Sequence, residues 1–150
     1  MPSITRHPRV IPPGESRRIL LAAQGLSKPP ATRSGPASVQ VLIERLGFVQ
    51  VDSINVLERA HHLILHTRLE SYRPETLSKL LEQERSLFEH WTHDASVIPT
   101  RWFEHWKPRF AGYADRIDRN EWWHERLGGD PAPLLARIHA RVRDGGPLRG

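Results

Sequence analysis

The spacing of apolar and polar residues predicts a chain built mainly from short helices. The clearest case is the stretch 37–47, where apolar side chains recur every three or four positions, as on one face of a helix, at Val39, Leu42, Ile43 and Leu46. Gly47 follows this run directly and is a typical helix end. Comparable patterns predict further helices over residues 15–26, 53–69, 73–84, 101–110, 114–128 and 131–146.

Two stretches have the patterning of extended chain instead. Residues 48–52 alternate, so that Gln50 and Asp52 fall on one face and the valines on the other. Ser53 then follows as the expected N-cap of the next helix. Residues 86–99 are predicted to form a hairpin arm or wing. Helices combined with a small β element predict a mainly α fold with short β elements, of the winged helix-turn-helix class.

Segments rich in proline, glycine and serine divide the chain. Residues 1–14 contain four prolines and are expected to form an extended lead-in, and residues 27–38 are expected to form a loop. We expect a winged-helix-like unit over residues 15–99, followed by a helical extension over residues 100–150. The length suits one ordinary domain, or two small units that share a core.

The composition is that of a globular protein, with 38% hydrophobic and 26% charged residues. The apolar runs are shorter than the ~20 residues that cross a membrane, so no membrane association is expected. The first fourteen residues carry arginines without an apolar stretch and do not have the pattern of a signal peptide. The lack of cysteine excludes disulfides and thiolate zinc sites, and is compatible with a reducing cytoplasm.

The formal charge of +5 comes entirely from the first 45 residues. They hold seven basic and two acidic side chains, whereas the remainder holds 15 of each. A local basic field suits a polyanion such as nucleic acid. The candidates for phosphate contacts surround the first helix and the proline-rich loop, and they are Arg17, Arg18, Lys28 and Arg33. A solvated, arginine-rich surface explains the same residues equally well.

Histidine and tryptophan suggest two further kinds of chemistry. His62 and His66 lie four residues apart on a predicted helix, a spacing that two ligands of one metal ion use. No third ligand follows at a fixed spacing, so packing is the favoured interpretation, and we expect neither a metal nor a cofactor. All five tryptophans lie within residues 91–123. Such rings stack on bases in some proteins, but they more often pack in a core.

Gln50 and Asp52 form the most informative pair. A carboxamide and a carboxylate two residues apart on extended chain point the same way. The amide can orient a water molecule, and the carboxylate can accept a proton from it or stabilise positive charge on a sugar as a glycosidic bond breaks. On spacing alone, ordinary capping by Asp52 and Ser53 explains the pattern better.

Two quoted stretches then change the interpretation. Residues 46–69, "LGFVQVDSINVLERAHHLILHTRL", and residues 87–99, "LFEHWTHDASVIP", closely resemble the AlkZ/YcaQ-like family of bacterial winged-helix DNA glycosylases. The resemblance extends over nearly the whole chain from residue 15. The family motif is Gln or His, an aliphatic residue, and Asp or Gln. Here it is Gln50, Val51 and Asp52, the Asp form that is typical of the crosslink-unhooking branch.

The resemblance implies a monofunctional DNA repair glycosylase that acts on N3- or N7-alkylated purines in double-stranded DNA and unhooks interstrand crosslinks. Asp52 would activate water and stabilise the oxocarbenium-like transition state, and Gln50 would orient the water or the sugar. No cofactor is implied, and the protein would be a monomer in the bacterial cytoplasm, associated with the nucleoid.

Family members are longer tandem arrays of winged-helix units, so we expect this chain to be a truncated N-terminal portion of one. The rival interpretations are a non-catalytic winged-helix DNA-binding protein, an inactive fragment, or a protein-interaction module that uses residues 101–123.

Overall fold

The computed structural model describes residues 10–32, 34–126, 128 and 130–146. The chain forms two compact units, residues 1–103 and residues 104–150, and each is described by itself. The predicted division at residues 99 and 100 into a winged-helix unit and an extension stays a prediction. Pro13 already belongs to the first helix, which therefore begins two residues earlier than expected.

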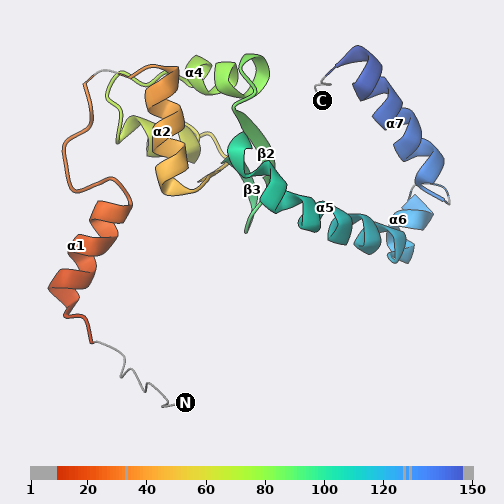
Figure 1. The fold of residues 1–150 in the computed structure, drawn as a ribbon, viewed down its shortest axis with the longest axis horizontal. Coiled ribbons are helices and arrows are strands. Elements are labelled where there is room, and N and C mark those ends of the chain that lie inside the picture. The colour runs from red at the N-terminus through yellow and green to blue at the C-terminus, as the bar shows by residue number, and fades with distance from the viewer. Residues whose placement is uncertain (1–9, 33, 127, 129, 147–150) are drawn as a thin grey trace, which may run out of the picture. The chain divides into compact units, whose positions relative to one another are not determined.

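The first unit combines short helices with a small sheet (Figure 1). Its helices are α1 (Pro13–Ala23), α2 (Pro36–Leu46), α3 (Ala60–His66), α4 (Pro74–Ser78), the π-helical turn η1 (Lys79–Gln83) and the 3-10 turn η2 (Thr100–Trp102). Its strands are β1 (Val49–Gln50), β2 (Leu87–Trp91) and β3 (Ala95–Pro99).

The three strands form an antiparallel sheet in the order β1-β3-β2. Strands β2 and β3 are the two arms of the hairpin expected over residues 86–99, with Leu87 opposite Pro99 and Trp91 opposite Ala95. Strand β1 joins the other edge of β3, with Val49 opposite Val97. The predicted fold class is therefore confirmed: the chain is mostly helical, with a small sheet compatible with a winged helix. The tandem array stays a prediction.

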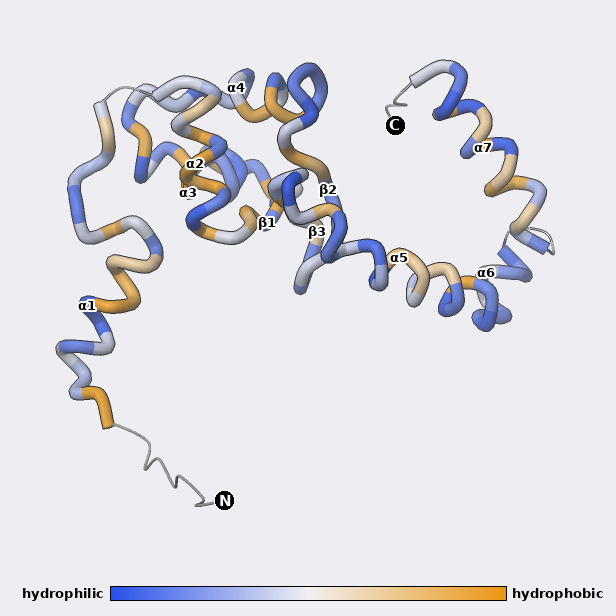
Figure 2. The backbone as a smooth tube through the Cα atoms, viewed as in Figure 1, coloured by the Kyte–Doolittle hydropathy of each residue, from blue (hydrophilic) through white to orange (hydrophobic). Residues whose placement is uncertain are grey.

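Helix α2 supplies one wall of the core. Three of the four residues of its predicted apolar face are buried, and Leu46 packs partly against them. Gly47 ends the helix at φ +95°, a conformation that glycine adopts without the steric cost of a Cβ. Figure 2 shows apolar positions where α2, α3 and the strands lie. The core consists of Val39, Leu42, Ile43, Val49, Leu65, Leu69, Tyr72, Leu77, Leu80, Leu87 and Val97.

The helix expected over residues 53–69 is wrong in its first half. Helix α3 begins only at Ala60, and Ser53 does not cap it. The physical reason is that the apolar residues after Ser53 find no core: Val56 and Leu57 are 91% and 90% exposed. The residue types at 53–56 (Ser, Ile, Asn and Val) also have low helix propensity, and no burial offsets that cost here.

The second unit contains helices α5 (Phe103–Asp118, which starts at the last residue of the first unit), α6 (Glu121–Arg126) and α7 (Ala132–Gly145). The break expected between residues 110 and 114 is absent, and the chain turns at Asn120 instead. There the Asn120 side chain accepts a hydrogen bond from the Trp122 N–H at 3.1 Å, which serves as a helix cap. No residue described on α5 or α7 is buried. Within the described residues, no helix is both long and apolar enough to span a membrane.

Candidate active site

Gln50 lies at the edge of the sheet with its side chain exposed. The strand pairs on one side only, where Gln50 lies opposite Ser96 and the Val51 N–H donates to the Ala95 carbonyl at 2.8 Å. Val49 is 2% exposed, so the alternation along β1 directs this valine into the core and the Gln50 amide to solvent. Strand pairing therefore presents the carboxamide at an open edge.

Asp52 follows the strand and is half-buried. Its Oδ1 accepts a hydrogen bond from the Ile54 N–H at 2.9 Å, the short-range turn that aspartate side chains commonly form. Its own backbone N–H donates to Nδ1 of His61 at 3.1 Å. The carboxylate and the backbone of Asp52 are thus each held by a separate contact.

His61 is the functional candidate that sequence reasoning missed. It is only 4% exposed, and because Nδ1 accepts a backbone N–H, its proton must lie on Nε2. Burial lowers the pKa of His61 below its ordinary value of 6.5, and the charges of His62 and Arg59 lower it further. Asp52 and Glu58 act in the opposite direction without reversing the shift. His61 is therefore neutral at pH 7, as the hydrogen bond requires.

His62 connects this polar cluster with Tyr72. Its Nδ1 lies 2.7 Å from the hydroxyl of Tyr72, and its ring centroid lies 4.1 Å from that of His61. Burial raises the pKa of Tyr72 above its ordinary value, so its hydroxyl stays protonated. His66, the other member of the predicted pair, is exposed. No group of three or more potential ligands for a metal ion occurs among the residues described.

Comparison with known protein families identifies the family of this chain. The family model described as DNA glycosylase AlkZ-like matches residues 43–150, well over half of the sequence. The chain belongs to the AlkZ-like DNA glycosylase family. This confirms the resemblance seen in the sequence, and the matched range includes Gln50, Asp52 and His61. No solved structure matches the chain.

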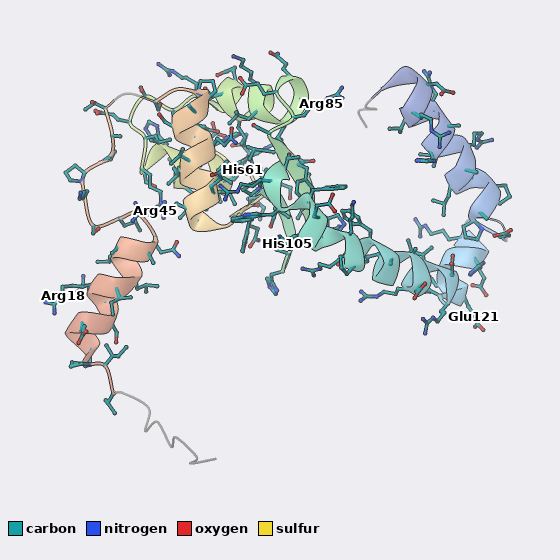
Figure 3. The ribbon with its side chains drawn as sticks, viewed as in Figure 1. Arg18, Arg45, His61, Arg85, His105 and Glu121 are labelled. Atoms are coloured by element: carbon teal, nitrogen blue, oxygen red, sulfur yellow. The ribbon has the colours of Figure 1, made fainter. Side chains whose placement is uncertain are left out.

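Membership of this family indicates a DNA repair glycosylase with DNA as its substrate. Of the basic residues expected to contact DNA, Arg17 and Arg18 are exposed on α1, and Lys28 is exposed in the following loop. Arg33 lies outside the described residues. Figure 3 shows Arg18 on α1, well separated from His61. The structure therefore does not place Arg18 at the Gln50–Asp52 element.

Lys28 instead lines a groove of about 470 Å³ together with Arg45 and Arg68. Arg45 donates to the carbonyl of Ala22, and Arg68 Nε donates to the carbonyl of Gln24 at 2.7 Å. These carbonyls lie at the C-terminal end of α1, where cations are favoured. The two arginines therefore anchor α1 and add positive charge beside Lys28, a combination that the sequence pattern did not reveal.

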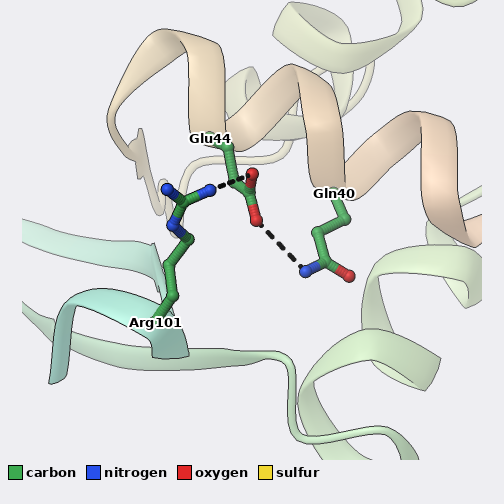
Figure 4. A network of polar contacts seen from close by, with 3 residues as sticks. All are labelled: Gln40, Glu44 and Arg101. Carbon is green, nitrogen blue, oxygen red and sulfur yellow. Dashed lines mark hydrogen bonds and ion pairs between the residues drawn. The ribbon is translucent and has the colours of Figure 1, made fainter.

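A polar network connects α2 with the end of the hairpin (Figure 4). Glu44 on α2 pairs with Arg101 at 2.9 Å through Oε2 and accepts a hydrogen bond from Gln40 at 3.2 Å through Oε1. The Arg101 side chain is 64% exposed, so the pair contributes at most about 1 kcal/mol. The pair adds a contact between α2 and the turn η2, which directly follows β3.

Proposed function

We propose that this AlkZ-like protein hydrolyses the N-glycosidic bond of N3- or N7-alkylated purines in double-stranded DNA. The observation that carries the proposal is the double anchoring of Asp52, whose carboxylate is oriented by the Ile54 N–H and whose backbone is held by His61. A catalytic carboxylate needs a fixed position relative to the reacting carbon, and this arrangement supplies one.

Alkylation at N3 or N7 makes the purine cationic and a good leaving group. The C1′–N bond breaks with its electron pair moving to the purine, and positive charge develops on the sugar. The carboxylate of Asp52 stabilises that charge and accepts a proton as water attacks C1′. The exposed carboxamide of Gln50 orients the water with one donor and one acceptor. The products are the free base and an abasic site.

The site has features that favour bulky lesions. Gln50 is exposed and Asp52 is half-buried, at the open edge of a sheet. A base that is crosslinked to the opposite strand cannot enter a closed pocket, so an open edge suits it better. We therefore include unhooking of interstrand crosslinks in the proposal.

His61 acts as a positioning residue in this scheme. It does not reach the substrate through Nδ1, because that atom is occupied by the Asp52 N–H. Its contribution is to hold the backbone of Asp52 where the motif leaves the sheet.

The test is Asp52→Asn, which removes the charge while preserving the shape of the side chain. We expect release of 7-methylguanine from methylated duplex DNA, measured by chromatography, to fall at least about a hundredfold. Binding to the duplex, measured by fluorescence anisotropy, should stay within about twofold, because the neutral amide leaves the basic surface unchanged.

Asp115→Asn is the matched control, since Asp115 is exposed on α5. It should excise at the parental rate. Undiminished excision by Asp52→Asn would refute the assignment. Sequence-selective binding to undamaged duplex without any excision would instead favour a non-catalytic winged-helix protein.

A further inference from the structure

The loop between the motif and α3 holds large apolar side chains in water. Ile54 is 68% exposed, Val56 is 91% exposed and Leu57 is 90% exposed. The last two are the most exposed large apolar side chains in the described part of the chain. Leaving three such side chains in solvent is unfavourable, so their position needs a reason other than folding.

The loop is closed at its base. The Asp52 N–H donates to His61 Nδ1 across nine residues of sequence, and the Ile54 N–H donates to the Asp52 carboxylate. The loop that carries the exposed side chains therefore begins at the carboxylate. Val56 is four residues from Asp52, which limits their separation along the chain to about 14 Å.

We propose that Ile54, Val56 and Leu57 form an apolar wedge that enters the base stack beside the alkylated nucleotide. This inference rests on the proposed function, because it takes the duplex to be the ligand of Asp52. A sugar whose C1′ reaches Asp52 brings its neighbouring base pairs, about 3.4 Å apart along the helix, within the reach of the loop.

Apolar side chains suit this occupant. Proteins that unstack and bend duplex DNA commonly insert such side chains between base steps. The contact is independent of base sequence, as a lesion-processing protein requires. Arg59, at the end of the same loop, is exposed and supplies a cation for an adjacent phosphate. Separating the neighbouring base from the damaged nucleotide would also open C1′ to the attacking water.

The first experiment measures insertion of the loop into duplex DNA when there is no glycosidic bond to cleave. The probe is a duplex with a tetrahydrofuran abasic site and 2-aminopurine as the adjacent base, whose fluorescence rises on unstacking. We expect the parental protein to raise the fluorescence at saturation, and the double substitution Val56→Ser with Leu57→Ser to lose most of that rise. Val10→Ser is the matched control, since Val10 is 89% exposed and lies far from the motif in sequence. It should behave like the parent.

The second experiment measures excision of 7-methylguanine. The double variant should show a kcat/KM lower by about tenfold, as expected when two interfacial apolar side chains are truncated. Its Tm should stay within about two degrees of the parental value, because exposed side chains contribute little to folding.

Each outcome decides the question. If the double variant raises the 2-aminopurine fluorescence as much as the parental protein does, the wedge proposal is overturned. A fall of several degrees in the Tm of the double variant would also overturn it, because the loop would then be packing against the protein itself. If the parental protein excises nothing, the proposed function fails, yet the abasic probe still reports whether the loop inserts.

Discussion

Helices α2 and α7 have similar apolar spacing but opposite surroundings. On α2, Val39 and Ile43 are fully buried in the core of the first unit. On α7, Leu135, Ile138 and Val142 recur at intervals of three and four, and each is more than 40% exposed. Figure 2 shows apolar and polar positions interspersed along α7. Periodicity thus predicts where a helix has an apolar face, and burial alone determines whether that face stabilises it.

The largest expected difference between the two units comes from truncating one side chain in each. Ile43→Ala should lower the free energy of unfolding of the first unit by about 2–5 kcal/mol, because it empties a fully buried site. Leu135→Ala should change the stability of the second unit by less than about 1 kcal/mol, since its side chain is 46% exposed. Hydrogen exchange of individual amides measures both. Equal effects would show that α7 is packed as tightly as α2.

Replacing a glycine by alanine should change the stability of the two units in opposite directions. Gly47→Ala should destabilise the first unit by about 1–2 kcal/mol, because φ is +95° and a Cβ is strained there. Gly112 lies within α5 with nothing within 4 Å of the position of an added Cβ. Gly112→Ala should therefore stabilise α5 by about 0.5–1 kcal/mol. Circular dichroism during urea titration provides the measurement, and a destabilised Gly112→Ala protein would contradict the open environment described for α5.

The smallest effect concerns pH and the first unit alone. The pKa of His61 is lowered by burial, so the unfolded chain binds a proton more readily than the folded one. The stability that neutral His61 contributes to the first unit is complete above pH 6.5 and declines as the pH falls below that value. The urea midpoint should therefore be lower at pH 5.5 than at pH 7.5.

His61→Asn offers a matched test of this pH effect, because an amide oxygen can accept the Asp52 N–H without titrating. This variant should excise near the parental rate at pH 7.5 and show a weaker acid loss of both stability and activity. The pKa of His62 is also lowered, so His62 retains part of the loss of stability at acidic pH in this variant. An acid profile identical to that of the parent would contradict the role given to His61.

The predictions from sequence succeeded where local spacing carries the information. The face of α2, its end at Gly47 and the hairpin over residues 86–99 follow from periodicities of three to four and of two, and all are present. The start of α3 was misplaced, because residues 53–59 have helical spacing but no surface to pack against. The break expected within 110–114 is absent for a different reason: Gly112 lowers helix propensity without ending the helix.

By itself the sequence determined the fold class and the family, and it supplied the proposal of Gln50 and Asp52 as the catalytic pair, because these depend on residue type and short-range order. Only the tertiary structure decided that His61 holds Asp52, that Arg45 and Arg68 join Lys28, and that the loop after the motif stands in solvent. Each of these depends on contacts between residues distant along the chain, or on what surrounds a segment. Neither leaves a periodic signal in the sequence.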